Sequence, residues 1–392
     1  MNSAYFPKSP SPSQKAILLF LFCTMLFWGS VYIYMPILPP YAQMVGGSLQ
    51  AAGLVMGAYG LSQLLLRIPI GIWVDYLGRR KPFIFLGFIL DGAASLGLAF
   101  SHSTATLFLS VFTAGMAASM WVAFTVLFAN YFPLGQVGRS MGMILFCTRF
   151  SQAVTNYAGG AIAESWGWEG PFYAGAVLSL LGLVLTIHIP ERRPEKYFSL
   201  SSKNFLLVGR NPKLLTVSAL ALLLQFAVSS TTAGFTPIYA QRIGASKEEL
   251  GILLFAFMVS TMLASLLAGT YARRLQSERS VILTGYLLIT GALFPIPLVS
   301  RLSILYALQI LNGIGVGLVF PLLLGLAIQP VPLEQQGTAM GFFQSLYAVG
   351  MSLGPIISGV VGDHLGLPSV FILSGILCLL AAFFSWKKIW MA

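Results

Sequence analysis

Charge is scarce in this sequence: only 8% of its 392 residues are Asp, Glu, Lys or Arg. No charged residue occurs between Lys15 and Arg67, and none occurs between Gly92 and Gly138. These gaps exclude an ordinary soluble domain, because they leave too few charges to cover a surface in water. Each gap can hold two helices of about 20 residues, the length that crosses the hydrocarbon core of a bilayer. The chain is therefore predicted to be a membrane protein.

Cysteine and histidine are also scarce, with three residues of each. Each cysteine lies in a different apolar stretch, which excludes a disulfide framework, and no Cys or His pair has the spacing of a zinc site. The match Gly350-x-Ser352-x-Gly354 to a nucleophile elbow lies inside an apolar stretch, without the strand that such a motif requires. We expect no metal, no cofactor and no enzymatic activity.

Charged and Pro/Gly-rich loops divide the chain into twelve apolar segments, which predicts an all-α membrane protein with twelve transmembrane helices. The first apolar run is too long for a cleaved signal sequence, so this helix is expected to stay in the membrane up to a turn at Pro39-Pro40. The predicted spans are 15–38, 48–74, 82–101, 104–131, 138–163, 171–190, 213–240, 247–272, 280–299, 302–329, 335–362 and 368–388.

Lys and Arg are divided unevenly between the two sides of this predicted topology. Of the 22 Lys and Arg residues, 17 fall on the side of the termini, three on the other side and two inside spans. Because cytoplasmic loops are enriched in Lys and Arg, both termini are predicted to be cytoplasmic and the protein to lie in the cytoplasmic membrane. The same asymmetry explains the net charge of +11, so that charge is no indication of nucleic-acid binding.

The two halves of the chain repeat one another. PPYAQMVGGS at 39–48 recurs as PIYAQRIGAS at 237–246, a shift of 198 residues. PLGQVGRSMG at 133–142 recurs as PLEQQGTAMG at 332–341, a shift of 199 residues. A duplication of this length, in the same orientation, predicts two pseudo-symmetric six-helix bundles.

Glycines keep the register of this repeat, as in Gly53/Gly251 and Gly160/Gly359. In membrane proteins built from such repeats, the substrate site lies near the bilayer midplane between the two halves. The predicted parts are a cytoplasmic tail at 1–14, a bundle at 15–190, a basic cytoplasmic linker at 191–212, a second bundle at 213–388 and a tail at 389–392.

The stretch Gly71-x-x-x-Asp75-x-x-Gly78-Arg79-Arg80, after the second predicted helix, resembles the signature loop of the major facilitator superfamily. The PILPPYAQ stretch that ends the first helix is similar to the 12-helix drug-exporter branches of that family. With the repeat and the basic linker, the resemblance covers the whole chain. It implies a monomeric secondary transporter that moves a small-molecule substrate across the lipid bilayer by alternating access.

The resemblance also implies a role for the signature loop, which closes the cytoplasmic side in that family. Asp75 is expected to face the positive N-terminus of a helix from the other half. Gly71 permits close helix approach, and Gly78 suits a left-handed helix end. Arg79 and Arg80 are expected to anchor the loop at the cytoplasmic surface.

Asp91, Arg149 and Arg67 are charged residues inside predicted spans. At 1.5 Å per residue from the cytoplasmic ends of their helices, Asp91 and Arg149 lie at similar depth near the midplane. A charge there costs about 2.5 to 3.5 kcal/mol, so such residues usually pair or serve a pathway. One prediction is an ion pair between Asp91 and Arg149, with Arg67 as the competing partner. The alternative is that Asp91 exchanges protons and couples transport to a proton gradient.

Arg149, Gln152 and Asn156 recur at i, i+3 and i+7, so they share one face of the fifth helix. A polar stripe at this depth predicts a cavity lining, and Arg149 favours an anionic or zwitterionic cargo. Gln344 and Tyr347 have comparable spacing on the eleventh helix. The helices that line the cavity in the similar family add Trp28, Tyr32, Trp121, Gln225, Gln309 and Asn312. Aromatic groups with a few polar side chains suit an amphipathic organic solute.

The predicted function is proton-coupled export of a small, drug-like, anionic or zwitterionic solute. The fourth predicted helix lacks the arginine that many proton-coupled members carry, and Thr155-Asn156-x-x-Gly159-Gly160 departs from their antiporter signature. A uniporter or importer of sugars or organic acids therefore stays open as an alternative. A membrane receptor or scaffold that does not transport is the alternative from another class.

Overall fold

A computed structural model describes residues 13–132, 136–191, 210–275, 277–329 and 336–386. These residues form helices and loops, with no strand among them. The helices of the first half are α1 (Gln14–Tyr32), α2 (Leu38–Gly46), α3 (Leu49–Leu77), α4 (Lys81–Ala99), α5 (Thr104–Ser119), α6 (Trp121–Ala129), α7 (Val137–Trp166) and α8 (Gly170–Thr186). Those of the second half are α10 (Pro212–Ser230), η2 (Thr231–Phe235), α11 (Thr236–Arg242), α12 (Lys247–Leu275), α13 (Glu278–Leu293), η3 (Ile296–Leu298), α14 (Leu302–Ile328), α15 (Gln336–Leu365) and α16 (Pro368–Trp386).

Every predicted span overlaps a helix, but the helices are interrupted inside several of the spans. The predicted span 104–131 is divided at Met120 into α5 and α6. The predicted span 213–240 passes through η2, a π-helical turn between α10 and α11. The predicted turn at Pro39-Pro40 is wrong, because both prolines lie in the first turn of α2. Proline is tolerated at that place since the first N–H groups of a helix have no partner within the helix.

Ten helical segments among the described residues are long and apolar enough to cross a membrane. A further apolar helix, Gly170–Thr186, is shorter. Helix α7 has 30 residues, which is long enough to cross a membrane, but it carries the polar stripe of the fifth predicted span. It is not among the ten apolar segments. The all-α membrane fold is thereby supported, whereas the count of twelve spans stays a prediction.

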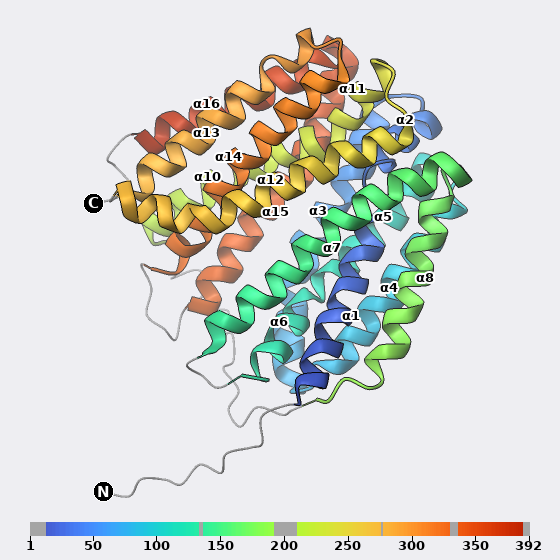
Figure 1. Cartoon of the computed structure of the whole chain (residues 1–392), viewed down its shortest axis with the longest axis vertical. Coiled ribbons are helices and arrows are strands. Elements are labelled where there is room, and N and C mark those ends of the chain that lie inside the picture. The colour runs from blue at the N-terminus through green and yellow to red at the C-terminus, as the bar shows by residue number, and fades with distance from the viewer. Residues whose placement is uncertain (1–12, 133–135, 192–209, 276, 330–335, 387–392) are drawn as a thin grey trace, which may run out of the picture.

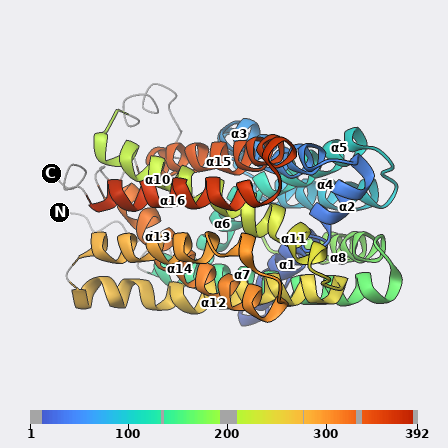
Figure 2. The ribbon, with the colours of Figure 1, turned by 90° about the horizontal axis from the view of Figure 1, so that it is seen from above.

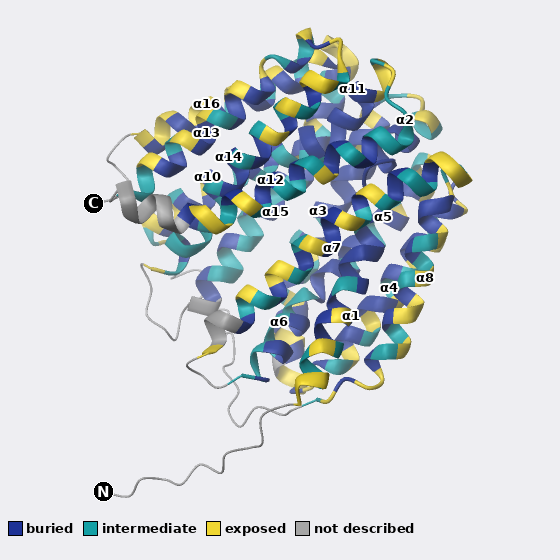
Figure 3. Ribbon diagram, in the orientation of Figure 1, coloured by how far each residue is buried: buried dark blue, intermediate teal, exposed yellow. Residues whose placement is uncertain are grey.

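The surface of the protein carries many large apolar side chains. Leu180, Leu263 and Phe384 are each more than half exposed, on α8, α12 and α16. Figure 3 shows such exposed positions along the outward faces of the helices, with buried positions between them. An apolar surface of this extent is unfavourable in water and fits contact with lipid tails.

Helices α1–α8 gather on one side of the molecule and α10–α16 on the other (Figures 1 and 2). Two helix pairs join the sides: α3 packs on α15, and α7 packs on α12. Helices α2 and α11 also touch, next to the N-termini of α3 and α12. We call this region the α2–α11 end; the beginning of α1 and the end of α16 lie away from it in Figure 1.

Glycines allow α3 and α15 to approach until their backbones touch. A Cβ added at Gly53 would lie 2.2 Å from the carbonyl oxygen of Pro355, and one at Gly57 would lie 2.7 Å from that of Ser352. From α15, a Cβ at Gly359 would lie 2.7 Å from the carbonyl oxygen of Leu49. No larger side chain fits at these distances, so the small residues set the helix spacing.

The same arrangement recurs between α7 and α12. A Cβ at Gly160 would lie 2.8 Å from the Cα of Gly251, and one at Gly251 would lie 2.8 Å from the carbonyl oxygen of Asn156. Gly53 and Gly251 are partners in the sequence repeat, as are Gly160 and Gly359. The repeated glycines therefore lie at two equivalent helix contacts, both in the halves of the helices nearest the α2–α11 end.

Replacing Gly53 by valine is expected to lower the thermal unfolding temperature of the purified protein, because the new side chain would push α3 away from α15. Overpacking of this kind typically costs about 1 to 3 kcal/mol. Gly142→Ala is the control: a Cβ at Gly142 meets no atom within 4 Å, so helix propensity alone predicts no loss. Equal unfolding temperatures for the Gly53→Val variant and the wild type would contradict the close approach.

Candidate functional site

Two carboxylates join the sides of the molecule at the α2–α11 end. Asp363 of α15 accepts hydrogen bonds from the backbone N–H groups of Leu49 (2.8 Å) and Gln50 (2.9 Å), the first residues of α3. Glu164 of α7 accepts one from the N–H of Lys247 (2.9 Å), the first residue of α12. Glu164 and Asp363 are 199 residues apart, in the register of the repeat. Each acid thus lies at the N-terminus of a helix from the opposite side. It accepts from N–H groups that have no partner within that helix, and it faces the positive end of the helix dipole.

The predicted gate loop is described in part. Gly78 has φ 60°, which confirms the left-handed helix end predicted for it, and Gly71 is buried in α3. The backbone N–H groups of Arg80 and Lys81 both donate to the carboxylate of Glu191. The side chain of Asp75 lies outside the described residues, so its contact with a helix N-terminus stays a prediction.

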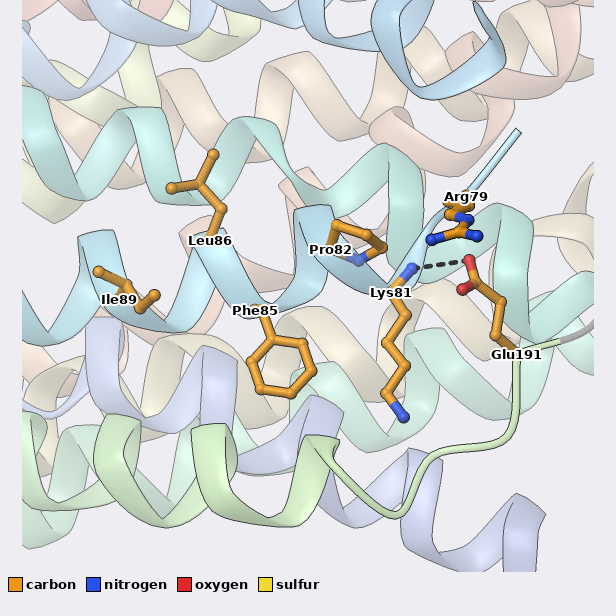
Figure 4. Close-up of a pocket in the computed structure, with 7 residues that line it drawn as sticks. All are labelled: Arg79, Lys81, Pro82, Phe85, Leu86, Ile89 and Glu191. Carbon is orange, nitrogen blue, oxygen red and sulfur yellow. Dashed lines mark hydrogen bonds between the residues drawn. The ribbon is translucent and has the colours of Figure 1, made fainter. Parts of the chain in front are cut away.

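An open, mainly apolar pocket lies beside this loop. Its lining, drawn in Figure 4, consists of Arg79, Lys81, Pro82, Phe85, Leu86, Ile89 and Glu191. The ammonium group of Lys81 donates to the carbonyl oxygen of Ile187 (2.7 Å), which ties the loop to the end of α8. None of the predicted cavity residues lines this pocket, so it is distinct from the candidate substrate site.

Arg67 of α3 reaches across to α15. Its Nη1 donates to the hydroxyl of Tyr347 (2.5 Å), and its guanidinium carbon lies 5.7 Å from the centre of the Tyr347 ring. Arg67 is only 8% exposed, and its Nε has no hydrogen-bond partner. The structure therefore brings two predicted site residues together, from opposite sides of the molecule.

The polar stripe on α7 is arranged as its spacing predicts. Nη1 of Arg149 donates to Oε1 of Gln152 at 3.0 Å, one turn away. Gln152 is buried, and Asn156 is completely buried with neither amide atom hydrogen-bonded. An unsatisfied buried amide is costly, and in this conformation no described residue is a partner for the amide of Asn156.

Three aromatic candidates from α1 and α6 form one cluster. The Trp28 ring lies 5.3 Å from that of Trp121 and 6.0 Å from that of Tyr32, both in edge-on geometry. Nε1 of Trp28 is buried without an acceptor. Tyr32 lies within electrostatic range of Arg149 and of Tyr347, the residue that accepts a hydrogen bond from Arg67.

A second polar cluster lies in the second half of the chain. Asn312 donates from Nδ2 to the hydroxyl of Thr232 (2.9 Å), which in turn donates to Oε1 of Gln309 (3.3 Å). Thr232 belongs to the π-helical turn η2, a wide turn often found at functional sites. Gln225 and Gln344, the other candidates here, are partly exposed and outside this network.

The predicted ion pair between Asp91 and Arg149 is wrong, as is the competing pair with Arg67. Asp91 is completely buried, and its Oδ2 accepts from the hydroxyls of Ser30 and Ser179 (2.8 Å for Ser179). Those serines lie on α1 and α8, whereas Arg149 is on α7. Position along a helix does not determine which neighbour a helix face meets.

Several residues of the site had no strong signal in the sequence. Thr232, Ser30 and Ser179 are small hydroxyl residues in apolar spans, where such residues are common. Glu164 and Asp363 could have been found from the repeat, because they are acids at equivalent positions in the last turns of α7 and α15.

Comparison with known proteins agrees with this architecture. A family model described as Major Facilitator Superfamily matches residues 20–246 and 218–390. MJ1560, an MFS-type transporter of Methanocaldococcus jannaschii, is 23% identical over 390 residues, which cover 94% of this chain and 96% of its own. The quinolone resistance protein NorA of Staphylococcus aureus is 23% identical over 360 residues, which cover 91% of this chain and 92% of its own. A crystal structure of a bacterial homologue of the lysosomal transporter Spinster, inward-facing and unoccupied, gives a TM-score of 0.80 at 15% identity and covers 95% of each chain.

The fold and these relatives define a multi-pass membrane transporter and not an enzyme. Both halves of the chain are matched by the family model. The chain belongs to the Major Facilitator Superfamily, and it is a secondary transporter of a small molecule.

Replacing Asp363 by alanine is expected to speed hydrogen–deuterium exchange at the start of α3, because Leu49 and Gln50 lose their acceptor. Loss of a helix N-cap costs about 0.5 to 2 kcal/mol, and Glu164→Ala should affect the start of α12 in the same way. Glu169→Ala is a matched control, since Glu169 is exposed at the N-terminus of α8 and makes no capping bond with its side chain. Unchanged exchange at residues 49–50 would show that the cap does not hold α3.

Proposed function

We propose that this protein exports a small organic solute by alternating access, as a monomer that spans the cytoplasmic membrane twelve times with both termini in the cytoplasm. The moving parts are the bundles 15–190 and 213–388, connected by the linker 191–212. On this topology the α2–α11 end faces the outside of the cell. The conformation described above is then closed to the outside and corresponds to the inward-facing state.

The observation that carries this proposal is the form of the contacts between the bundles. They include glycine contacts and two helix caps at the α2–α11 end, with polar and charged groups farther along the same helices. Contacts of this kind can separate without exposing a hydrophobic core, as a rocking motion requires. The resistance protein NorA is a relative whose name supports export over uptake.

The proposed cargo is anionic or zwitterionic and amphipathic. Arg149 and Gln152 supply hydrogen-bond donors beside the aromatic cluster of Trp28, Tyr32 and Trp121. An apolar, aromatic wall with a few directed polar groups suits an organic solute that carries a charged group.

Coupling to protons is proposed to involve Asp91. The hydroxyl of Ser30 lies 2.8 Å from the carbonyl oxygen of Phe27 as well as against Asp91, and its single proton can serve only one of these two acceptors. When Asp91 is protonated, its carboxyl can donate to the oxygen of Ser30, and the Ser30 hydroxyl can donate to the carbonyl oxygen of Phe27. When Asp91 is ionised, the Ser30 hydroxyl donates to Asp91 instead. The local hydrogen bonding therefore differs between the two protonation states of Asp91.

The proposed function is tested by counterflow in proteoliposomes. A panel of labelled aromatic carboxylates, zwitterions and sugars is measured against the same unlabelled solute, with and without a pH gradient. We expect counterflow of a carboxylate or zwitterion, accelerated by a pH gradient. Counterflow of a sugar that ignores the gradient would favour a uniporter, and binding without any counterflow would favour a receptor.

Asp91→Asn is expected to abolish transport driven by a pH gradient and to spare counterflow. Asparagine keeps the size and hydrogen bonding of the protonated acid but cannot release a proton. One proton crossing 100 mV provides about 2.3 kcal/mol, so the loss of coupling should be readily measured as lost accumulation. Undiminished pH-driven transport in this variant would exclude Asp91 from coupling.

A further inference from the structure

Arg67 is a buried cation that has no counter-charge among the residues that the structure describes. Among the described residues its hydrogen-bond partner is a neutral one, the hydroxyl of Tyr347, and its Nε has no partner. The carboxylates Glu164 and Asp363 are engaged at the α2–α11 end instead. A buried charge without an opposite charge is strongly unfavourable, so a protein that keeps one usually uses it.

The hydrogen-bonding capacity around Arg67 points to one kind of ligand. A guanidinium has five N–H donors and no acceptor. Tyr347 uses its oxygen to accept from Arg67, which leaves its O–H free to donate. Arg67 and Tyr347 together therefore present donors alone, and such a set is complementary to an anion with several acceptor oxygens.

The surroundings extend this preference. Tyr59 and Tyr32 lie within electrostatic range of Tyr347, and each is also in range of an arginine, Arg67 for Tyr59 and Arg149 for Tyr32. Tyr59 is in range of Asp91 as well, a carboxylate that accepts hydrogen bonds from Ser30 and Ser179. The region therefore holds two guanidinium groups among phenol rings. Planar guanidinium groups bind carboxylates through paired hydrogen bonds, and aromatic rings accept the apolar body of the same molecule.

We propose that Arg67 and Tyr347 form the binding site for the carboxylate of the transported solute, an aromatic or similarly amphipathic organic acid. The inference rests on the transport function proposed above and assigns its charged group to a site on α3 and α15. Since these two helices belong to opposite bundles, a bound carboxylate contacts both bundles at once. Arg67 thereby selects organic acids over amines and neutral analogues of the same shape.

Three probes with one ring system test this selection: 1-naphthaleneacetate, its amide, and 2-(1-naphthyl)ethylamine, each tritiated and measured by scintillation proximity on protein in nanodiscs. The wild type should bind the carboxylate at least tenfold more tightly than the amide or the amine. Arg67→Gln should weaken carboxylate binding about tenfold or more, which corresponds to about 1.4 kcal/mol, and should change amide binding less than twofold. Arg67→Lys should restore part of the affinity, and Tyr347→Phe should cause a smaller loss.

Arg242→Gln is the matched control, since Arg242 is an exposed arginine at the end of α11. It should leave the binding of all three probes unchanged. Thermal unfolding separates a binding role from a structural one. If Arg67 serves binding, Arg67→Gln removes an uncompensated buried charge and should unfold at the same temperature as the wild type or higher.

The inference is overturned if the wild type binds no carboxylate, if it binds the carboxylate and the amide equally, or if Arg67→Gln leaves carboxylate affinity unchanged. A lower unfolding temperature together with equal losses for all three probes would show that Arg67 is structural, and would overturn it too. The transport proposal fails differently. Carboxylate binding that depends on Arg67, without any counterflow, supports this site and refutes the transport proposal. Counterflow that is unchanged in Arg67→Gln supports the transport proposal and refutes this site.

Discussion

Backbone contact at glycine is the constraint on which the rest of this structure depends. Where α3 meets α15 and α7 meets α12, the helices are so close that no side chain separates them. That spacing brings the carboxylates of Asp363 and Glu164 within hydrogen-bonding distance of helix N-termini on the opposite side. It also lets a long side chain such as Arg67 cross the interface and meet Tyr347. A larger residue at these glycines would remove all three kinds of contact together.

Much of the architecture followed from the sequence because it depends on periodicity and composition. The uncharged gaps predicted apolar helices, the repeat identified the paired glycines, and Gly78 was assigned to a left-handed helix end that the backbone shows. The stripe of Arg149 and Gln152 was correct because residues three apart on a helix are neighbours whatever surrounds them. These are local properties, which a single sequence encodes directly.

The errors concern properties that are not local. Asp91 was given the wrong partner, since the rotation of α4 turns it toward Ser30 of α1 and Ser179 of α8. The break at Met120 arises inside an apolar stretch without proline, where packing decides the backbone. The turn at Thr231–Phe235 is followed by Pro237, which lacks the backbone N–H of a regular helix. The bond between Arg67 and Tyr347 joins residues 280 positions apart. No spacing rule along one chain reports such a contact.

The two helix caps stand at repeat-related positions on opposite bundles, and this symmetry affects how the interface can open. Tilting the bundles apart draws Asp363 from α3 and Glu164 from α12 in the same motion, so neither bond can be released while the other is kept at full strength. The two bonds are therefore released together, at exposed positions of the interface. In the rocking motion proposed above, such an interface favours two discrete arrangements of the bundles over a continuum.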